Sequence, residues 1–257
     1  MSRQAYVYLP KQLLFFWSPK CGNTSLGDFI FKNLEVDDAY HKNARKFLSN
    51  ANSKVGFKLA WKLINDHVFT GIVLSRNPYN RAVSAYLNKF VINRKKWIQN
   101  PDCMEGFSRK LFNQAKKYNN DFLPLGISFD DYLTHISCVL DQKKPLDPHF
   151  NTQVPFFLKD KNYYKHQLRL ESIDQDLVLL YELGFTGEFK KLRSTAPLDA
   201  NIPSNSEDLS NMPSFVLARE KIQPKFENLI NKKTASLIEK IYAIDFEILN
   251  YSPINYR

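Results

Sequence analysis

Two stretches of the chain show the same order of a short apolar run, a polar loop and a periodic helical stripe. The first apolar run, residues 13–17, has no polar alternation, which is typical of a strand buried on both faces of a parallel sheet. After a polar loop, apolar residues recur at helical spacing, namely Leu26, Phe29, Ile30 and Leu34. This pattern predicts a helix that begins near Asn23 or Thr24, either of which can cap it.

The second stretch repeats the arrangement further along the chain. Residues 71–75 form another short apolar run, Asn77 can cap the next helix, and Pro78 suits its first turn. The apolar stripe of that helix comprises Val83, Tyr86, Leu87, Phe90 and Val91. Two strand-loop-helix units in succession favour an α/β fold with a parallel sheet.

The remaining segments have weaker patterns. Residues 93–150 are rich in Lys, Asn and Asp and predict irregular helices and loops around a binding cleft. Residues 166–171 predict a further strand, and residues 172–183 predict a helix that ends before Gly184.

The carboxyl-terminal part predicts one loop and one helix. Residues 194–213 are rich in Pro, Asn, Ser and Asp and predict a loop. Residues 234–249 predict the last helix, whose inward face comprises Leu237, Ile241, Ile244 and Ile248.

The first polar loop, SPKCGNTS, has the chemistry of an anion site. Where a parallel strand ends and a helix begins, unpaired backbone N–H groups and the positive end of the helix dipole meet. Gly22 allows close approach of the backbone, Lys20 adds a cation, and hydroxyls follow at Thr24 and Ser25. The loop is not a Walker motif, because Lys20 precedes its single glycine. A plain strand-to-helix turn with a solvated lysine is the alternative for the loop taken alone.

The second loop adds another group suited to phosphate. Arg76 directly follows the strand of residues 71–75, and Ser84 lies eight residues later, about two turns into the next helix. A guanidinium and a hydroxyl on neighbouring elements can converge on one phosphate. Two phosphate sites indicate a nucleotide that carries two phosphate groups.

Together these motifs resemble those of the sulfotransferases that use 3′-phosphoadenosine 5′-phosphosulfate (PAPS), in particular the carbohydrate sulfotransferases of the sulfotransferase family 2 type. SPKCGNTSL is similar to their 5′-phosphosulfate loop, and RNPYNRAVSAYLNKF is similar to their 3′-phosphate motif. Residues 147–153, DPHFNTQ, resemble their His-aromatic-x-x-Gln segment, and residues 169–185 and 241–251 resemble further family segments.

The resemblance implies a fold and a domain organisation. We expect an α/β fold with a P-loop NTPase-like parallel β-sheet flanked by helices, in a single domain over residues 1–257. Residues 93–150 are expected to form a divergent insertion that shapes the acceptor cleft, and residues 194–213 a loop.

The resemblance also implies a reaction and assigns residues to it. PAPS would transfer its sulfuryl group to a hydroxyl of an acceptor, and no metal would be required. The resemblance implies that this acceptor is a carbohydrate. Arg76 and Ser84 are expected to hold the 3′-phosphate, and Lys20 to stabilise the leaving group as its charge develops. The residues expected to contact the nucleotide in the first loop are Pro19, Lys20, Cys21, Gly22, Asn23, Thr24, Ser25 and Leu26.

A general base is needed to take the proton of the acceptor hydroxyl, and histidine is the usual choice near neutral pH. His41 is the first candidate, because it lies 21 residues after Lys20, where the family commonly has its acid/base residue. His149 is the second candidate, since it belongs to the DPHFNTQ segment, and it could instead orient the acceptor. Glu171 and Asp245 are expected to be structural.

Composition limits the kinds of partner and the cellular location that we expect. The chain has 257 residues, 44% of them hydrophobic, which suffices for one large domain. A net charge of +10 favours an anionic partner, so a glycan acceptor that is itself anionic fits. Three cysteines make neither a disulfide framework nor a zinc motif. With no signal-peptide cleavage site and no run of about 20 apolar residues, we expect a cytoplasmic protein.

Three alternatives remain open at this point. A nucleotide kinase would need a Gly-Lys-Ser/Thr loop and an acidic magnesium ligand, but Arg76 stands where an Asp would be expected. A non-catalytic basic domain would bind nucleotide or nucleic acid, although no nucleic-acid recognition motif accompanies the charge. A degenerate sulfotransferase would bind the nucleotide without transferring its sulfuryl group.

Overall fold

The computed structural model describes residues 4–33, 54–91, 125–142, 146–154, 166–190, 203–204 and 206–254, together with residues 109, 113 and 201. The chain forms two compact units, each built from three stretches of sequence. The sheet unit comprises Met1–Asn77, Gln153–Arg193 and Glu247–Asn250. The helical unit comprises Pro78–Thr152, Ser194–Phe246 and Tyr251–Arg257. Because these stretches alternate along the chain, no single cut separates the units, which agrees with the single domain expected from the sequence.

The sheet unit contains a five-stranded mixed sheet in the order β3-β1-β2-β4-β5. Its strands are β1 (Gln4–Tyr8), β2 (Leu13–Phe16), β3 (Lys54–Gly56), β4 (Thr70–Ser75) and β5 (His166–Arg169). The three strands predicted from apolar runs, β2, β4 and β5, are parallel neighbours. The parallel sheet is therefore confirmed for these strands, and the sequence analysis missed β1 and β3, which pair antiparallel at one side.

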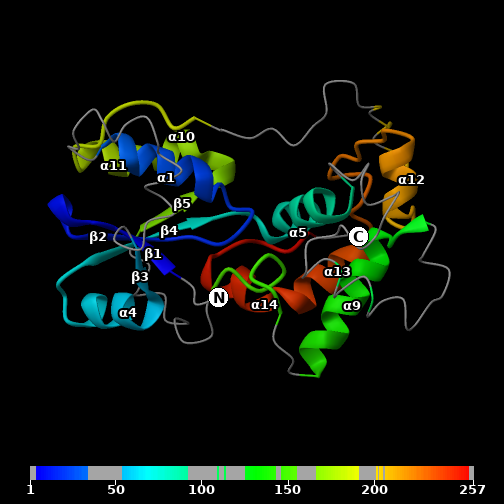
Figure 1. Ribbon diagram of the computed structural model, residues 1–257, viewed down its shortest axis with the longest axis horizontal. Helices are drawn as coiled ribbons and strands as arrows, with labels where there is room; N and C mark the ends of the chain where they lie inside the picture. The colour runs from blue at the N-terminus through cyan, green and yellow to red at the C-terminus, as the bar shows by residue number, and fades with distance from the viewer. Residues whose placement is uncertain are drawn as a thin grey trace. The chain divides into compact units, whose positions relative to one another are not determined.

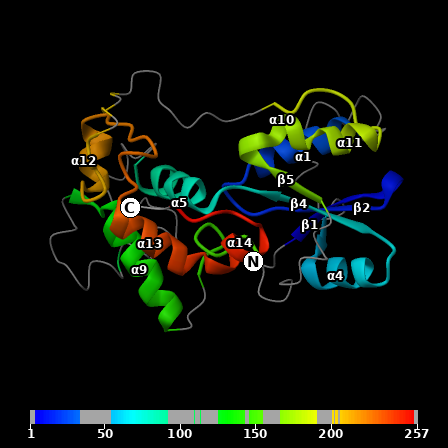
Figure 2. The same ribbon diagram turned by 180° about the vertical axis from the view of Figure 1, so that it is seen from behind.

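Helices cover both faces of this sheet. Those of the sheet unit are α1 (Asn23–Lys32), α4 (Phe57–Asn65), α10 (Ile173–Asp176) and α11 (Val178–Glu182), with short 3₁₀ turns η1 (Leu9–Lys11) and η6 (Leu170–Ser172). Both views place α1, α10 and α11 on one face of the sheet and α4 on the other (Figures 1 and 2). Strand residues buried on the first face include Phe15, Ile72 and Leu168, which pack in one cluster with Phe29 and Ile30 of α1. The α/β architecture is thus confirmed.

The helix predicted over residues 172–183 is divided into three pieces. The turn η6 leads into α10, and α11 begins after Leu177, whose backbone N–H still donates to the carbonyl of Ile173. Gly184 has a left-handed φ of +84° just past the end of α11, as expected for a glycine that stops a helix.

The helical unit packs its helices around an aromatic core. Its elements are α5 (Pro78–Tyr86), the π-helix η3 (Leu87–Val91), α9 (Phe129–Asp141), α12 (Ser214–Arg219), α13 (Lys232–Ile241) and α14 (Ala243–Ile248), which continues into the sheet unit. The predicted stripe of α5 and η3 is buried throughout. Ring centroids 5.2–6.2 Å apart connect five aromatic residues, namely Tyr86, Phe90, Phe129, Tyr132 and Phe150.

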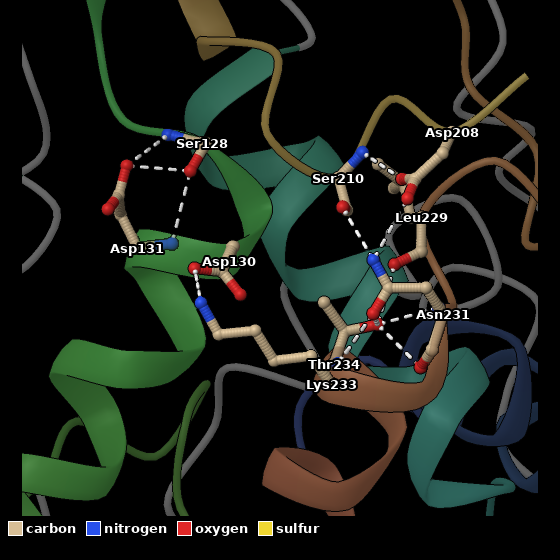
Figure 3. Close-up of polar contacts among 9 residues, drawn as sticks. All are labelled: Ser128, Asp130, Asp131, Asp208, Ser210, Leu229, Asn231, Lys233 and Thr234. Atoms are coloured by element: carbon tan, nitrogen blue, oxygen red, sulfur yellow. Dashed lines mark hydrogen bonds and ion pairs between the residues drawn. The ribbon is translucent and has the colours of Figure 1, made fainter.

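Two capping boxes fix the starts of α9 and α13 (Figure 3). Ser128 accepts from the backbone N–H of Asp131, and Asn231 accepts from the backbone N–H of Thr234, while each partner side chain reaches back to the cap. Lys233 of α13 lies 2.7 Å from Asp130 of α9, which joins the two helix starts. Among the described residues, no helix is long and apolar enough to cross a membrane.

Candidate functional site

The loop between β2 and α1 presents Lys20 and Gly22 at the carboxyl end of a central parallel strand. Lys20 adopts a left-handed backbone with φ +72°, which costs a non-glycine residue about 1–3 kcal/mol. The backbone N–H of Cys21 donates to the carbonyl of Ser18 at 3.2 Å, which closes the loop tightly. A strained lysine in a closed loop, just before a helix start, is typical of a site that must hold one fixed shape.

Gly22 is required at its position for two independent reasons. Its φ is +82°, and a Cβ built on it would lie 2.9 Å from Cδ1 of Leu170. Gly22 is also the N-cap of α1, so the predicted caps Asn23 and Thr24 were wrong, and both are helical residues. Because Gly22 has no side chain to cap this turn, the first backbone N–H groups of α1 have no side-chain acceptor from the cap, which suits an anion.

Arg76 lies at the neighbouring strand end and contacts the loop directly. Its Nη1 donates to the carbonyl oxygen of Lys20 at 3.1 Å. A guanidinium has five N–H donors, so holding Lys20 and binding an anion are compatible. The structure therefore brings together two of the predicted binding residues, Lys20 and Arg76, at the ends of adjacent strands β2 and β4.

Gln153 ties these two strand ends together. Its Oε1 accepts from the backbone N–H of Arg76 at 2.9 Å and from the thiol of Cys21 at 2.9 Å. Its Nε2 donates to the carbonyl of Arg76 at 2.8 Å. Gln153 and Cys21 are both buried, so these bonds form away from solvent. Gln153 is the last residue of the DPHFNTQ segment, and nothing in the sequence predicted its role.

Glu171 supports the same edge of the sheet from η6, directly after β5. One carboxylate oxygen accepts from the backbone N–H of Asn77 at 2.9 Å, which fixes the residue after Arg76. This contact is of the structural kind expected for Glu171. Asp245, the other carboxylate expected to be structural, is fully buried in the helical unit.

Ser84 and Arg81 lie on α5, in the helical unit. Ser84 is half-buried, and since Arg76 belongs to the sheet unit, their convergence on one phosphate stays a prediction. Arg81 is 1% exposed and donates to the carbonyl of Pro148 at 3.3 Å. This arginine therefore holds the backbone of the DPHFNTQ segment.

The histidines differ in their surroundings. His41 lies outside the described residues. His149 is partly exposed, and its Nδ1 is 2.6 Å from a carboxylate oxygen of Asp147. His67 follows the end of α4 and has an exposed side chain, whereas His135 is buried in α9, where burial lowers its pKa. His166 is partly exposed in β5.

Comparison with protein families gives one match. A model described as "Sulfotransferase family" matches residues 4–252, which include both units. Comparisons with curated proteins and with solved structures find no match.

Proposed function

Because the chain belongs to the sulfotransferase family, we propose that it transfers a sulfuryl group from PAPS to a hydroxyl of a carbohydrate acceptor. The observation that carries the proposal is the joined pair of strand ends, in which Arg76 donates to the carbonyl of Lys20 beside a glycine-capped helix start. Two cations and the first amides of α1 then face the same edge of the sheet, as a donor with phosphate groups requires.

The residues of the sheet unit fit this donor. The close backbone approach at Gly22 and the amides that follow it suit the 5′-phosphate, with the hydroxyls of Thr24 and Ser25 as further donors. Pro19 and Cys21 of the loop, with Asn23 and Leu26 at the start of α1, complete the surroundings proposed for this phosphate. Arg76 would hold the 3′-phosphate, with Ser84 as its second donor. When bound, PAPS supplies the activated sulfuryl group.

Lys20 and a histidine would carry the chemistry. The ammonium group of Lys20 stabilises the negative charge that develops on the departing phosphate oxygen, an interaction that strengthens only in the transition state. His149 or His41 accepts the proton of the acceptor hydroxyl. Gln153 lies four positions after His149, so the covalent chain keeps their backbones within about 14 Å in any arrangement of the units. The cytoplasmic location expected from the sequence stays a prediction.

A thermal-shift comparison tests the choice of nucleotide. Adenosine 3′,5′-bisphosphate, the product of transfer, should raise the melting temperature by about 5–10 °C at a hundredfold excess over its Kd. ATP with magnesium should have a much smaller effect. Stabilisation by ATP with magnesium and none by the bisphosphate would contradict the proposal and favour a kinase.

Replacement of Lys20 tests the reaction. Lys20→Ala should lower turnover of radiolabelled PAPS with a panel of glycan acceptors by about 100- to 1,000-fold, while the bisphosphate still stabilises the fold. Lys32→Ala is the matched control, because Lys32 is exposed at the end of α1 and forms a local i,i+4 ion pair with Asp28. Normal turnover in Lys20→Ala would contradict the assigned role.

A further inference from the structure

The turn around His149 fixes both the backbone and the ring of this residue. One oxygen of the Asp147 carboxylate accepts from the backbone N–H of His149 at 2.9 Å and lies 2.6 Å from its Nδ1. The carbonyl of Asp147 accepts from the N–H of Phe150 at 2.9 Å. An ionised carboxylate can only accept, so Nδ1 is the donor in this contact, and a ring with a single proton keeps a lone pair on Nε2.

Two helices hold the turn on either side of the histidine. Arg81 of α5 donates to the carbonyl of Pro148, and the Tyr242 hydroxyl, at the end of α13, donates to the carbonyl of Phe150 at 3.0 Å. Burial raises the pKa of Tyr242 to about 12, so this phenol stays protonated as a donor. The Arg81 guanidinium also lies 5.6 Å from the centre of the Tyr242 ring, which joins the two anchors.

Asp147 is held in its ionised form. Partial burial alone would raise the pKa of its carboxyl, but the hydrogen bonds from the His149 ring and backbone outweigh it. The positive charge of Lys89, in η3, acts in the same direction, and the resulting pKa lies below the ordinary value. The side chains of His149 and Asp147 are 30% and 26% exposed, so a substrate hydroxyl can reach this pair.

We infer that Asp147 is a positioning residue, which holds the His149 ring so that Nε2 takes the proton of the acceptor hydroxyl. The inference rests on the proposed function and chooses His149 over His41 as the base. As the new S–O bond forms on the acceptor oxygen, its proton passes to Nε2, and the S–O bond to the nucleotide phosphate breaks. The imidazolium then returns its proton to water, and the chain ends unchanged.

A merely local role is the competing explanation. An Asp that accepts from the backbone N–H two residues on is a common turn, and it would stabilise residues 147–150 without any part in catalysis. The positioning role requires the bond between the Asp147 carboxylate and the His149 ring, whereas the local turn needs only the bond to the backbone N–H of His149. The tautomer of His149 therefore separates them.

The direct test is the tautomer of His149 in full-length, ¹⁵N-labelled protein at about pH 8, where a histidine ring is ordinarily neutral. Long-range ¹H–¹⁵N spectra should show Nδ1 protonated in the wild type and a shift towards Nε2–H in Asp147→Ala. His149→Ala identifies the resonance. Protonation mainly at Nε2 in the wild type would overturn the inference, even if every variant at position 147 failed to fold.

Kinetics supply the second test. Asp147→Ala should lower turnover by about 10- to 100-fold, and His149→Ala by about 100- to 10,000-fold, with unchanged affinity for the bisphosphate. Asp147→Asn keeps an oxygen acceptor without the charge and should fall between wild type and Asp147→Ala. Asp141→Ala, which removes an exposed carboxylate paired with Lys240, is the matched control.

A double variant decides whether Asp147 acts through His149. Asp147→Ala combined with His149→Ala should be no slower than His149→Ala alone, because the positioning residue then has nothing to position. An additive loss, or normal turnover in His149→Ala, would overturn the inference. If the bisphosphate fails to stabilise the protein, the proposed function fails by itself, whereas the tautomer still reports on the Asp147–His149 pair.

Discussion

At the scale of single residues, Gln153 has a structural role that the sequence did not reveal. Its amide satisfies both backbone groups of Arg76 and the thiol of Cys21 at the ends of β4 and β2. One planar amide thus fixes the two loops to which phosphate binding is assigned. We expect its loss to weaken ligand binding without any direct contact with the ligand.

Gln153→Leu tests this role. The change removes all three buried bonds, two of them to the backbone of Arg76, so the free energy of unfolding should fall by about 1–3 kcal/mol. Affinity for the bisphosphate should fall as well, and the Cys21 thiol should react faster with a thiol reagent. Gln175→Leu, on the exposed side of α10, is the matched control. Unchanged affinity in Gln153→Leu would show that the two loops keep their shape alone.

The sequence predicted some site residues better than others for a physical reason. Lys20, Gly22 and Arg76 were found because each follows a buried strand, and strand ends are visible as local patterns. Gln153 was missed because its partners lie 77 and 132 residues earlier in the chain. Asp147 was missed in the same way, since the anchors of its turn come from α5 and α13.

At the scale of elements, the helices departed from prediction where a buried polar contact competed with periodicity. The stripe over residues 234–249 predicted one helix, yet α13 ends at Ile241 and α14 starts at Ala243. Tyr242 stands between them, fully buried and bonded to the carbonyl of Phe150. Consequently Ile244 and Ile248 are only partly buried, while Asp245 and Phe246 face inward. Helix α9 lies in the segment predicted to contain irregular helices and loops, and its capping box explains its regular start.

Helix α9 also makes the fold sensitive to mild acid through His135. Burial lowers the pKa of this residue in the folded state, so below the ordinary value of about 6.5 the unfolded chain binds the proton more readily. Its contribution to stability is complete above that value and falls as the pH drops towards the folded pKa.

His135→Gln should therefore flatten the dependence of stability on pH. As the pH falls below about 6.5, the free energy of unfolding measured in urea should fall more steeply for the wild type than for the variant, by up to about 1.4 kcal/mol per pH unit. The same replacement at exposed His67 is the control. Parallel losses in wild type and His135→Gln would show that other groups cause the acid sensitivity.

At the scale of the whole molecule, Arg76 and Ser84, the two residues proposed to hold the 3′-phosphate, belong to different units. The family match runs through both units, and the segment from Arg76 to Ser84 crosses from one to the other. The sequence thus predicted the order of the two strand-loop-helix units and the family. The antiparallel strands β1 and β3 were not predicted, because strands of only five and three residues leave little periodicity.

Binding to variants of Arg76 and Ser84 tests whether these two residues share a phosphate. In calorimetry, Arg76→Ala should lower the affinity for adenosine 3′,5′-bisphosphate by about 10- to 100-fold. The affinity for adenosine 5′-phosphate should fall far less, because this nucleotide has no 3′-phosphate. Ser84→Ala should show the same discrimination, and the two losses should be coupled in the double variant. Arg219→Ala controls for removal of one exposed positive charge. Equal losses for both nucleotides would contradict the assignment.

The position of Gln153 also bears on how the protein is made. Cys21 is synthesised 132 residues before Gln153, which accepts a hydrogen bond from its thiol. At about 5–20 residues per second, the nascent loop waits roughly 7–26 s for that partner. During translation the loop around Lys20 must therefore exist without its hydrogen bond to Gln153. A chain truncated before Gln153 would never form this bond.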